Sequence, residues 1–150
     1  RMAMKKLDRR FGNSLKQLED PLYFAIIGLG KLGGRELTYH SDLDLIIVHS
    51  GKSKASQNDR LLIQEYGVKL IQRTIFLLTT ITRSGFAYTM DTRLRPSGNA
   101  GVLVTPWEVY FKYHRNSQAW EHQALVKGRI VAGATTQLES NGLFETIKLI

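Results

Sequence analysis

The chain has 150 residues, enough for one domain with a single hydrophobic core. Its 21 Lys and Arg residues against 13 Asp and Glu residues give a net charge of +8, which favours an anionic partner such as a nucleotide, a nucleic acid or an acidic protein surface. Cysteine is absent, which excludes disulfides, thiolate zinc sites and cysteine nucleophiles. Any chemistry must therefore use oxygen and nitrogen groups.

The hydropathy of the chain bears on its cellular location. No apolar run approaches the ~20 residues that cross a bilayer, and residues 1–20 form a polar, charge-mixed segment without the apolar stretch of a secretory signal. We therefore expect a cytoplasmic protein with no membrane partner. Because the chain begins with Arg1 and contains no linker-like segment, we expect residues 1–150 to be one domain taken from a longer multidomain polypeptide.

The first half of the chain contains two strand patterns and one helix pattern. Residues 23–30, "YFAIIGLG", form a short apolar run that ends in glycine, and residues 42–50, "DLDLIIVHS", form a second run with a polar tip. Both patterns predict buried strands. Residues 51–58 predict a loop by their composition. A long helix should follow, because apolar residues recur at steps of three, four and seven: Leu61, Val68, Ile71, Ile75 and Leu78.

A third strand is predicted over residues 86–94, after "TRSG" (82–85) ends the helix. Apolar and polar residues alternate here, so that side chains should point to opposite faces. One face carries Phe86, Tyr88 and Met90, and the other carries Ala87, Thr89, Asp91, Arg93 and Arg95. This strand should therefore present one acidic and two basic groups on the same side.

The last third predicts mainly helices. Residues 96–101 form a turn cluster and residues 102–104 a short strand, followed by Thr105 as N-cap, Pro106 at the first helical position and Glu108 closing a capping box. Helices are expected over 107–115 and about 118–132, with four aromatic core anchors: Trp107, Tyr110, Phe111 and Trp120. The predicted fold is α/β (α+β), a small mixed β-sheet with helices packed against one face.

The glycine-rich segment before the second strand permits an alternative interpretation. Gly28, Gly30 and Gly33 match the dinucleotide-binding pattern G-x-G-x-x-G. That pattern requires an acidic residue about twenty positions further on, at the carboxyl end of the next strand. At that distance the chain has His49 and Ser50. A dehydrogenase-type nucleotide site is therefore the weaker interpretation.

The acidic residues of the two later strands suggest different chemistry. Asp42 and Asp44 are separated by one residue, so they should project to the same face of a strand, and Asp91 adds a third carboxylate from another strand. Mg²⁺ prefers a few carboxylates plus substrate phosphates, and two metal ions can hold both the attacking and the leaving oxygen of an in-line displacement. Gly33 and Gly34 should allow backbone N–H groups to approach a phosphate closely. This set of residues favours nucleotidyl transfer.

The spacing of these residues resembles a known superfamily. "LGG" (32–34), seven residues and then "DLDL" (42–45) is similar to the glycine pair and following strand of polymerase-β-like nucleotidyltransferases. Three longer motifs are similar to the bacterial bifunctional glutamine synthetase adenylyltransferase/adenylyl-removing enzymes: "GLGKLGGRELTYHSDLDLIIV", "GFAYTMDTRLRPSGNAGVLVT" and "WEHQALVKGRIVAG". The second and third motifs look closer to the C-terminal, adenylylating copy of the two related domains in that family.

The resemblance implies a role for each matching residue. Asp42, Asp44 and Asp91 would be the catalytic carboxylates and the ligands of Mg²⁺ or Mn²⁺, and Gly33 and Gly34 would form the phosphate-binding turn. Ser41 matches the usual serine before the first carboxylate. Apart from the resemblance, Arg93 and Arg95 share the face of Asp91 and suit either bidentate contact with the triphosphate or an ion pair that orients the carboxylates, and Lys31 could add a point charge.

The implied reaction transfers AMP from ATP to a tyrosine of glutamine synthetase, with a nitrogen-signalling regulatory protein as a further partner. One alternative is the copy that removes AMP by phosphorolysis. A more distant alternative is a non-catalytic module that binds nucleotides or nucleic acid. The chain lacks the interleaved stacking aromatics of RNA-binding proteins, so we expect no nucleic-acid partner.

Overall fold

The computed structural model describes residues 2–18, 22–51, 56–83, 85, 87–116 and 119–133. Its centre is a mixed β-sheet with strand order β3-β2-β1-β5, in which β4 also pairs with β2. Neighbours β1 and β2 are antiparallel, as are β1 and β5, while β3 and β4 run parallel to β2. The strands are β1 (Phe24–Gly28), β2 (Leu43–His49), β3 (Met90–Asp91), β4 (Thr105–Pro106) and β5 (Arg129–Gly133).

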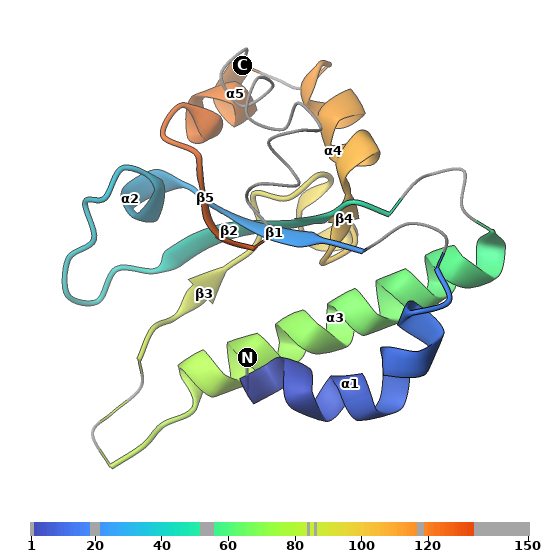
Figure 1. The fold of residues 1–150 in the computed structure, drawn as a ribbon. Coiled ribbons are helices and arrows are strands. Elements are labelled where there is room, and N and C mark those ends of the chain that lie inside the picture. The colour runs from blue at the N-terminus through green and yellow to red at the C-terminus, as the bar shows by residue number, and fades with distance from the viewer. Residues whose placement is uncertain are drawn as a thin grey trace.

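Helices cover both faces of this sheet (Figure 1). On one side lie α1 and α3, on the other lie α4 and α5, and α2 lies at the end of β1 (Figure 1). The helices are α1 (Met2–Leu15), α2 (Gly30–Gly33), α3 (Gln57–Thr79), α4 (Trp107–His114) and α5 (Ala119–Leu125), and a 3₁₀ turn spans Gly98–Ala100. No helix within the described ranges is both long and apolar enough to cross a bilayer.

The alternation of β2 divides the core into two clusters. Leu43, Leu45 and Ile47 pack with Ile71 of α3 on one face. On the other face, Ile46 and Val48 pack with buried residues of β1, α4 and α5: Ala25, Ile27, Tyr110 and Leu125. Because Asp44 is two residues before Ile46, it belongs to the α4 and α5 face. The expectation that helices cover only one face was wrong, since the continuous apolar run of β2 requires burial on both sides.

Helix α3 is confirmed and lies against α1. It begins after Ser56, whose hydroxyl accepts a hydrogen bond from the Asp59 N–H at 3.1 Å. Helix α1 had no predicted counterpart, because its sequence is polar and charge-mixed. It is anchored by Phe11, which is 4% exposed and meets Tyr66 of α3 edge-to-face with ring centroids 5.7 Å apart.

The predicted third strand is much shorter in the structure. Only Met90–Asp91 is a strand, paired with Leu43 and Asp44. Pairing stops because the chain turns at once, with the Arg95 N–H bonded to Thr92 O at 3.4 Å. Part of the predicted strand, at residue 86, lies outside the described residues.

The short strand predicted near residue 105 lies at a different position in the structure. Residues 102–104 are not a strand, and instead Thr105–Pro106 form β4 opposite Val48 and His49. Thr105 is therefore not the N-cap of α4, which begins after Pro106 without a side-chain cap. The predicted capping box was wrong because Thr105 is buried and its backbone pairs with β2. The conformation of Thr105 is therefore set by strand pairing and not by the helix that follows it.

The helix predicted over 118–132 contains two elements. Helix α5 ends at Leu125, the Gly128 N–H closes a turn onto Leu125 O at 2.6 Å, and β5 then pairs with the free edge of β1. Tyr110 is buried as predicted, and Trp107 and Phe111 are half-buried. Trp120 is 63% exposed, so its prediction as a core anchor was wrong.

The two adjacent glycines at the end of α2 differ in how closely they are packed. A Cβ on Gly33 would lie 2.2 Å from Lys127 O and 2.7 Å from Gly28 O, both rigid backbone atoms. A Cβ on Gly34 would meet flexible side-chain atoms, of which Lys127 Cδ is nearest at 2.9 Å. Gly33→Ala should therefore destabilise the fold by about 1–3 kcal/mol, as overpacking does.

The matched control is Gly34→Ala, which should change stability much less because its φ of −73° suits alanine. Urea unfolding followed by circular dichroism measures both variants. Equal unfolding midpoints for the two would contradict the close approach of residue 127 to Gly33.

Candidate active site

Three acidic residues meet where β2 and β3 begin to pair. The parallel register places Asp44 opposite Asp91 and Leu43 opposite Met90, and the Leu43 N–H bonds to Thr89 O at 2.9 Å. Asp42 directly precedes β2 and is exposed. Its carboxylate accepts a hydrogen bond from the Thr89 hydroxyl. The structure thus brings together the three carboxylates that the sequence predicted as a group.

The electrostatics of the three carboxylates differ. Burial raises the pKa of the half-buried Asp44 above its ordinary value, and the negative charges of Asp91 and Asp42 raise it further. Arg93 and Lys31 oppose this rise. The carboxylates therefore repel one another in the ionised state. A positive charge placed among them lowers the free-energy cost of ionising all three.

Arg93 neutralises one of these charges. Its Nε donates to both Asp91 oxygens at 3.0 and 2.9 Å, its Nη2 donates to Oδ2 at 2.5 Å, and its backbone N–H donates to Oδ1 at 2.8 Å. These hydrogen bonds lower the pKa of Asp91 and keep it ionised. The guanidinium side chain is 72% exposed, so it can also contact a bound anion.

Gly30 leaves the Asp44 carboxylate uncovered. The residue has φ +50°, and a Cβ there would lie 2.6 Å from Asp44 Oδ2. The preceding N–H, of Leu29, bonds to the Asp44 carbonyl at 2.9 Å and fixes the turn over β2. The glycine is therefore required both by the backbone conformation and by the approach to the carboxylate.

The glycine pair lies beside this site, but its N–H groups already have partners. The Gly33 N–H bonds to Leu29 O at 2.8 Å and the Gly34 N–H to Gly30 O at 3.0 Å. The turn is held from β5 by Arg129, which donates to Gly33 O at 3.0 Å and Leu32 O at 3.1 Å. Sequence reasoning missed Arg129, because nothing local connects residue 129 with residue 33.

Two other predicted phosphate ligands also have structural contacts. Ser41 is 7% exposed, and its hydroxyl accepts from the Thr38 N–H at 3.1 Å and pairs with the Thr38 hydroxyl at 2.9 Å. Arg95 donates to three carbonyl groups of its own loop, those of Thr92, Asn99 and Gly101. Ser41 therefore orders the turn before Asp42, and Arg95 orders residues 92–101.

The donor set fits a hard divalent cation in its chemistry. Carboxylate oxygens are the ligands that Mg²⁺ prefers, and a cation would relieve the repulsion that raises the pKa of Asp44. Across the described ranges, no three Asp, Glu or His side chains already surround one point. The carboxylate of Asp91 is bonded to Arg93. Asp42 and Asp44 are thus the first residues available to a metal, and Asp91 would join them by sharing its contact with Arg93.

The small mixed sheet carries three carboxylates at neighbouring strand ends beside Arg93 and Lys31, an arrangement that fits the class of nucleotidyltransferases. The antiparallel pairing of β1 with β2 excludes the parallel β-α-β unit of a dinucleotide-binding fold, so the dehydrogenase interpretation was wrong. The model of the glutamate-ammonia ligase adenylyltransferase family matches residues 1–143, and the chain belongs to that family.

Two curated relatives carry the name bifunctional glutamine synthetase adenylyltransferase/adenylyl-removing enzyme. The protein of Haemophilus ducreyi is 41% identical over 142 residues, which cover 92% of this chain and 15% of that protein. The protein of Hahella chejuensis is 50% identical over 113 residues, which cover 73% of this chain and 12% of that protein. The chain therefore corresponds to about one seventh of the length of these relatives.

The different contacts of the two arginines predict different effects of lysine substitution. Arg95→Lys should lower the stability by about 1–3 kcal/mol, because a lysine cannot replace several hydrogen bonds of about 0.5–1.5 kcal/mol each. Arg93→Lys should change the melting temperature little, because the side chain is largely exposed, and should instead weaken triphosphate binding. Thermal melting and titration with ATP and Mg²⁺ measure the two effects. An unchanged melting temperature for Arg95→Lys would contradict its role in the loop.

Proposed function

We propose that this domain transfers AMP from ATP to a tyrosine hydroxyl of glutamine synthetase in a Mg²⁺-dependent reaction that releases pyrophosphate. The observation that carries the proposal is the cluster of Asp42, Asp44 and Asp91, in which burial, and then the negative charges of Asp91 and Asp42, raise the pKa of Asp44. Such a cluster is destabilising unless a cation is bound. Membership of the adenylyltransferase family supports ATP as the nucleotide.

Each residue of the site has a proposed task. Asp42, Asp44 and Asp91 would hold the metal, which supplies positive charge to the phosphates when it is bound. The ammonium of Lys31 and the guanidinium of Arg93 would orient the triphosphate. Asp91, kept ionised by Arg93, would accept the proton of the tyrosine hydroxyl as its oxygen bonds to the α-phosphorus and the bond to the pyrophosphate oxygen breaks.

The remaining predicted phosphate residues would act mainly through the scaffold. Gly33 and Gly34 would keep α2 close to the strand ends, and Ser41 would fix Asp42. Arg95 would add positive charge while it holds residues 92–101. An open groove of about 980 Å³ beside Asp42, lined by residues 37–42, 85 and 87–89, provides room for the polypeptide that carries the acceptor tyrosine.

The direction of the reaction rests on resemblance. "RLRPSGNAGVLV" (93–104) and "WEHQAL" (120–125) resemble the adenylylating copy of the family. The phosphorolytic copy would need the same three carboxylates, because both reactions move the same AMP group. Contact with a nitrogen-signalling regulatory protein would involve the longer polypeptide, and a cytoplasmic location suits all of these partners.

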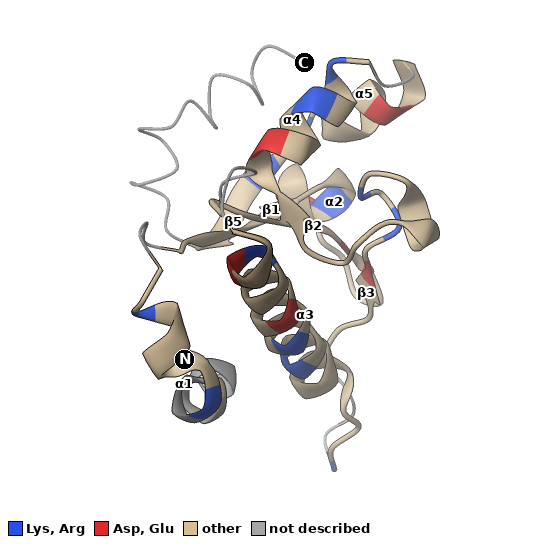
Figure 2. Ribbon diagram, turned by 90° about the vertical axis from the view of Figure 1, so that its right-hand side faces the viewer, with Lys and Arg blue, Asp and Glu red and all other residues tan. Residues whose placement is uncertain are grey.

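The surface charge does not favour the binding-module alternative. In Figure 2, basic residues of the described chain lie on α1, α2, α3 and α4, and several are accompanied by acidic residues. Lys69 pairs with Glu65 at 2.6 Å, and Lys127 pairs with Glu36 at 2.8 Å. A nucleic-acid site would gather basic residues along one face. Among the described residues, the basic side chains are instead distributed over several elements.

The proposed metal site predicts the effect of two substitutions. Asp42→Asn and Asp44→Asn should each reduce turnover by at least about 100-fold, because removing a metal ligand removes stabilisation that acts in the transition state. Asp44→Asn should not lower the melting temperature in metal-free buffer, because it removes a repulsive charge. The readouts are pyrophosphate release with Mg²⁺ and thermal melting without it. Turnover within tenfold of the wild type for both variants would contradict the metal assignment.

The direction of transfer can be measured on one preparation. We expect α-labelled ATP to transfer label to unmodified glutamine synthetase, and the adenylylated form to release little ADP when phosphate is supplied. The Asp44→Asn variant serves as the control for contaminating activity. Phosphate-dependent ADP release without label transfer would assign the domain to the removing copy and leave the metal assignment in place.

A further inference from the structure

A pocket of about 260 Å³ adjoins the carboxylates on the α4 and α5 face of the sheet. Two residues connect it with the site already described. Arg93 lines the pocket and also pairs with Asp91, while Leu29 lines the pocket and directly precedes Gly30, which lies over Asp44. A molecule bound to Arg93 and the carboxylates can therefore extend into this pocket.

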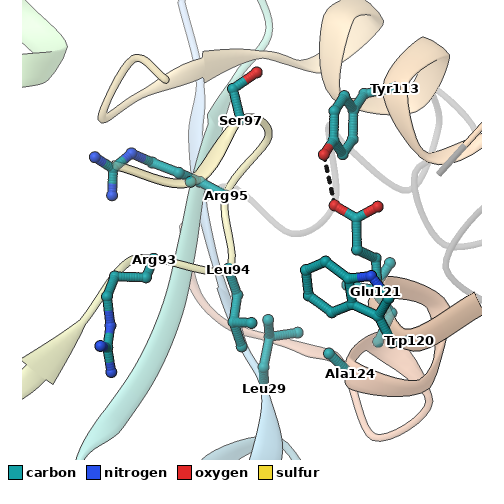
Figure 3. Close-up of a pocket in the computed structure, with 11 residues that line it drawn as sticks. Leu29, Arg93, Leu94, Arg95, Ser97, Tyr113, Trp120, Glu121 and Ala124 are labelled. Atoms are coloured by element: carbon teal, nitrogen blue, oxygen red, sulfur yellow. Dashed lines mark hydrogen bonds between the residues drawn. The ribbon is translucent and has the colours of Figure 1, made fainter. Parts of the chain in front are cut away.

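The lining of the pocket combines apolar walls with an exposed indole and a polar edge. Figure 3 shows Trp120 and Glu121 on one side, Arg93 and Arg95 on the other, and Leu94 between them. Trp120 is 63% exposed, although tryptophan is among the side chains that proteins bury most. An exposed ring facing an apolar wall offers a flat partner a surface on which to stack.

The polar edge is held rigidly. The Tyr113 hydroxyl donates to Glu121 Oε1 at 2.5 Å and accepts a hydrogen bond from the backbone of Ser97. His122 bonds to the carbonyl of His114 at 2.8 Å and ties α5 to the end of α4. The carboxylate of Glu121 thus has a fixed position from which it can accept a hydrogen bond from an amino group on a bound ring.

We propose that this pocket is the binding site for the purine base of the nucleotide, with Trp120 as the stacking surface and Glu121 as acceptor for the exocyclic amino group. The inference rests on the proposed function, because it assumes that the triphosphate lies at Arg93 and the carboxylates. The pocket volume of about 260 Å³ lies just below the usual range of ligand pockets, about 300–1,000 Å³, and suits a single heterocycle. A polypeptide acceptor needs more room, as in the groove of about 980 Å³ beside Asp42.

The stacking role is tested by comparing two ligands on the same variants. With Mg²⁺ present, Trp120→Ala should raise the Kd of ATP about fivefold or more and leave the Kd of inorganic tripolyphosphate unchanged, because only ATP carries a base. Trp120→Phe should restore most of the ATP affinity. Val126→Ala, at a residue 75% exposed and outside the pocket, is the matched control and should change neither value. Calorimetric titration gives both constants, and thermal melting verifies folding.

The acceptor role of Glu121 is tested with inosine triphosphate, which carries a ring carbonyl in place of the amino group. The wild type should bind it several-fold more weakly than ATP, because two acceptors would then face each other. Glu121→Gln should reduce this preference, since an amide can also donate a hydrogen bond. Equal affinity of the wild type for the two nucleotides would overturn the role of Glu121.

Three results would overturn the base site, and they differ from failure of the proposed function. Unchanged affinity of Trp120→Ala for ATP, or equal loss for ATP and tripolyphosphate, would remove the stacking role. A raised KM for the acceptor protein with unchanged ATP affinity would assign the pocket to the acceptor tyrosine. If the wild type bound neither ATP nor tripolyphosphate with Mg²⁺, the proposed function itself would fall.

Discussion

Mutual repulsion of three carboxylates is the constraint on which the site depends. The parallel pairing of β2 with β3 places Asp44 beside Asp91, and the pKa of Asp44 is raised first by its burial and then by the charges of Asp91 and Asp42. In this structure Arg93 supplies the compensating positive charge to Asp91. A bound divalent cation would add positive charge beside the carboxylates, and the phosphates of a nucleotide would add negative charge. Ligand binding and the ionisation of the three carboxylates are therefore coupled.

The charged group is held in place by the apolar residues that follow it in β2, because these are buried in the core. Ile46 and Val48 continue the face of Asp44 into the core, and Leu45 and Ile47 fill the opposite face. Strand β2 is therefore fixed on both sides, and its exposed beginning can carry an unfavourable charge cluster. From the far edge of the sheet, Arg129 bonds to the carbonyls at the end of α2 and keeps the glycine turn against the strand ends.

The pocket and the groove beside the carboxylates provide separate sites for the two proposed substrates of an adenylyltransferase domain. The smaller pocket lies behind Arg93, where a base would be surrounded by Trp120, Leu94 and Leu29. The larger groove is open beside Asp42 and lies between two loops. The transferred phosphorus would lie between these regions, at the metal held by the carboxylates. A nucleotide and a polypeptide could thus occupy the domain together, as an in-line transfer requires.

The sequence by itself determined the two buried strands, the long helix α3 and the shared face of Asp42 and Asp44, because each depends on local periodicity or on the spacing within one strand, whereas the pairing of β2 with β3 brings Asp91 to the other two. Family resemblance added the chemistry that spacing alone left open. Only the tertiary structure decided that Thr105–Pro106 pair with β2, that residues 129–133 form a strand against β1, and that Trp120 is exposed at a pocket. The two pairings join residues 57 to 108 positions apart in the chain, such as Val48 with Thr105 and Ala25 with Gly133. A local pattern cannot specify such partners, since the pairing of a short strand is set by the free edge that the rest of the sheet offers it.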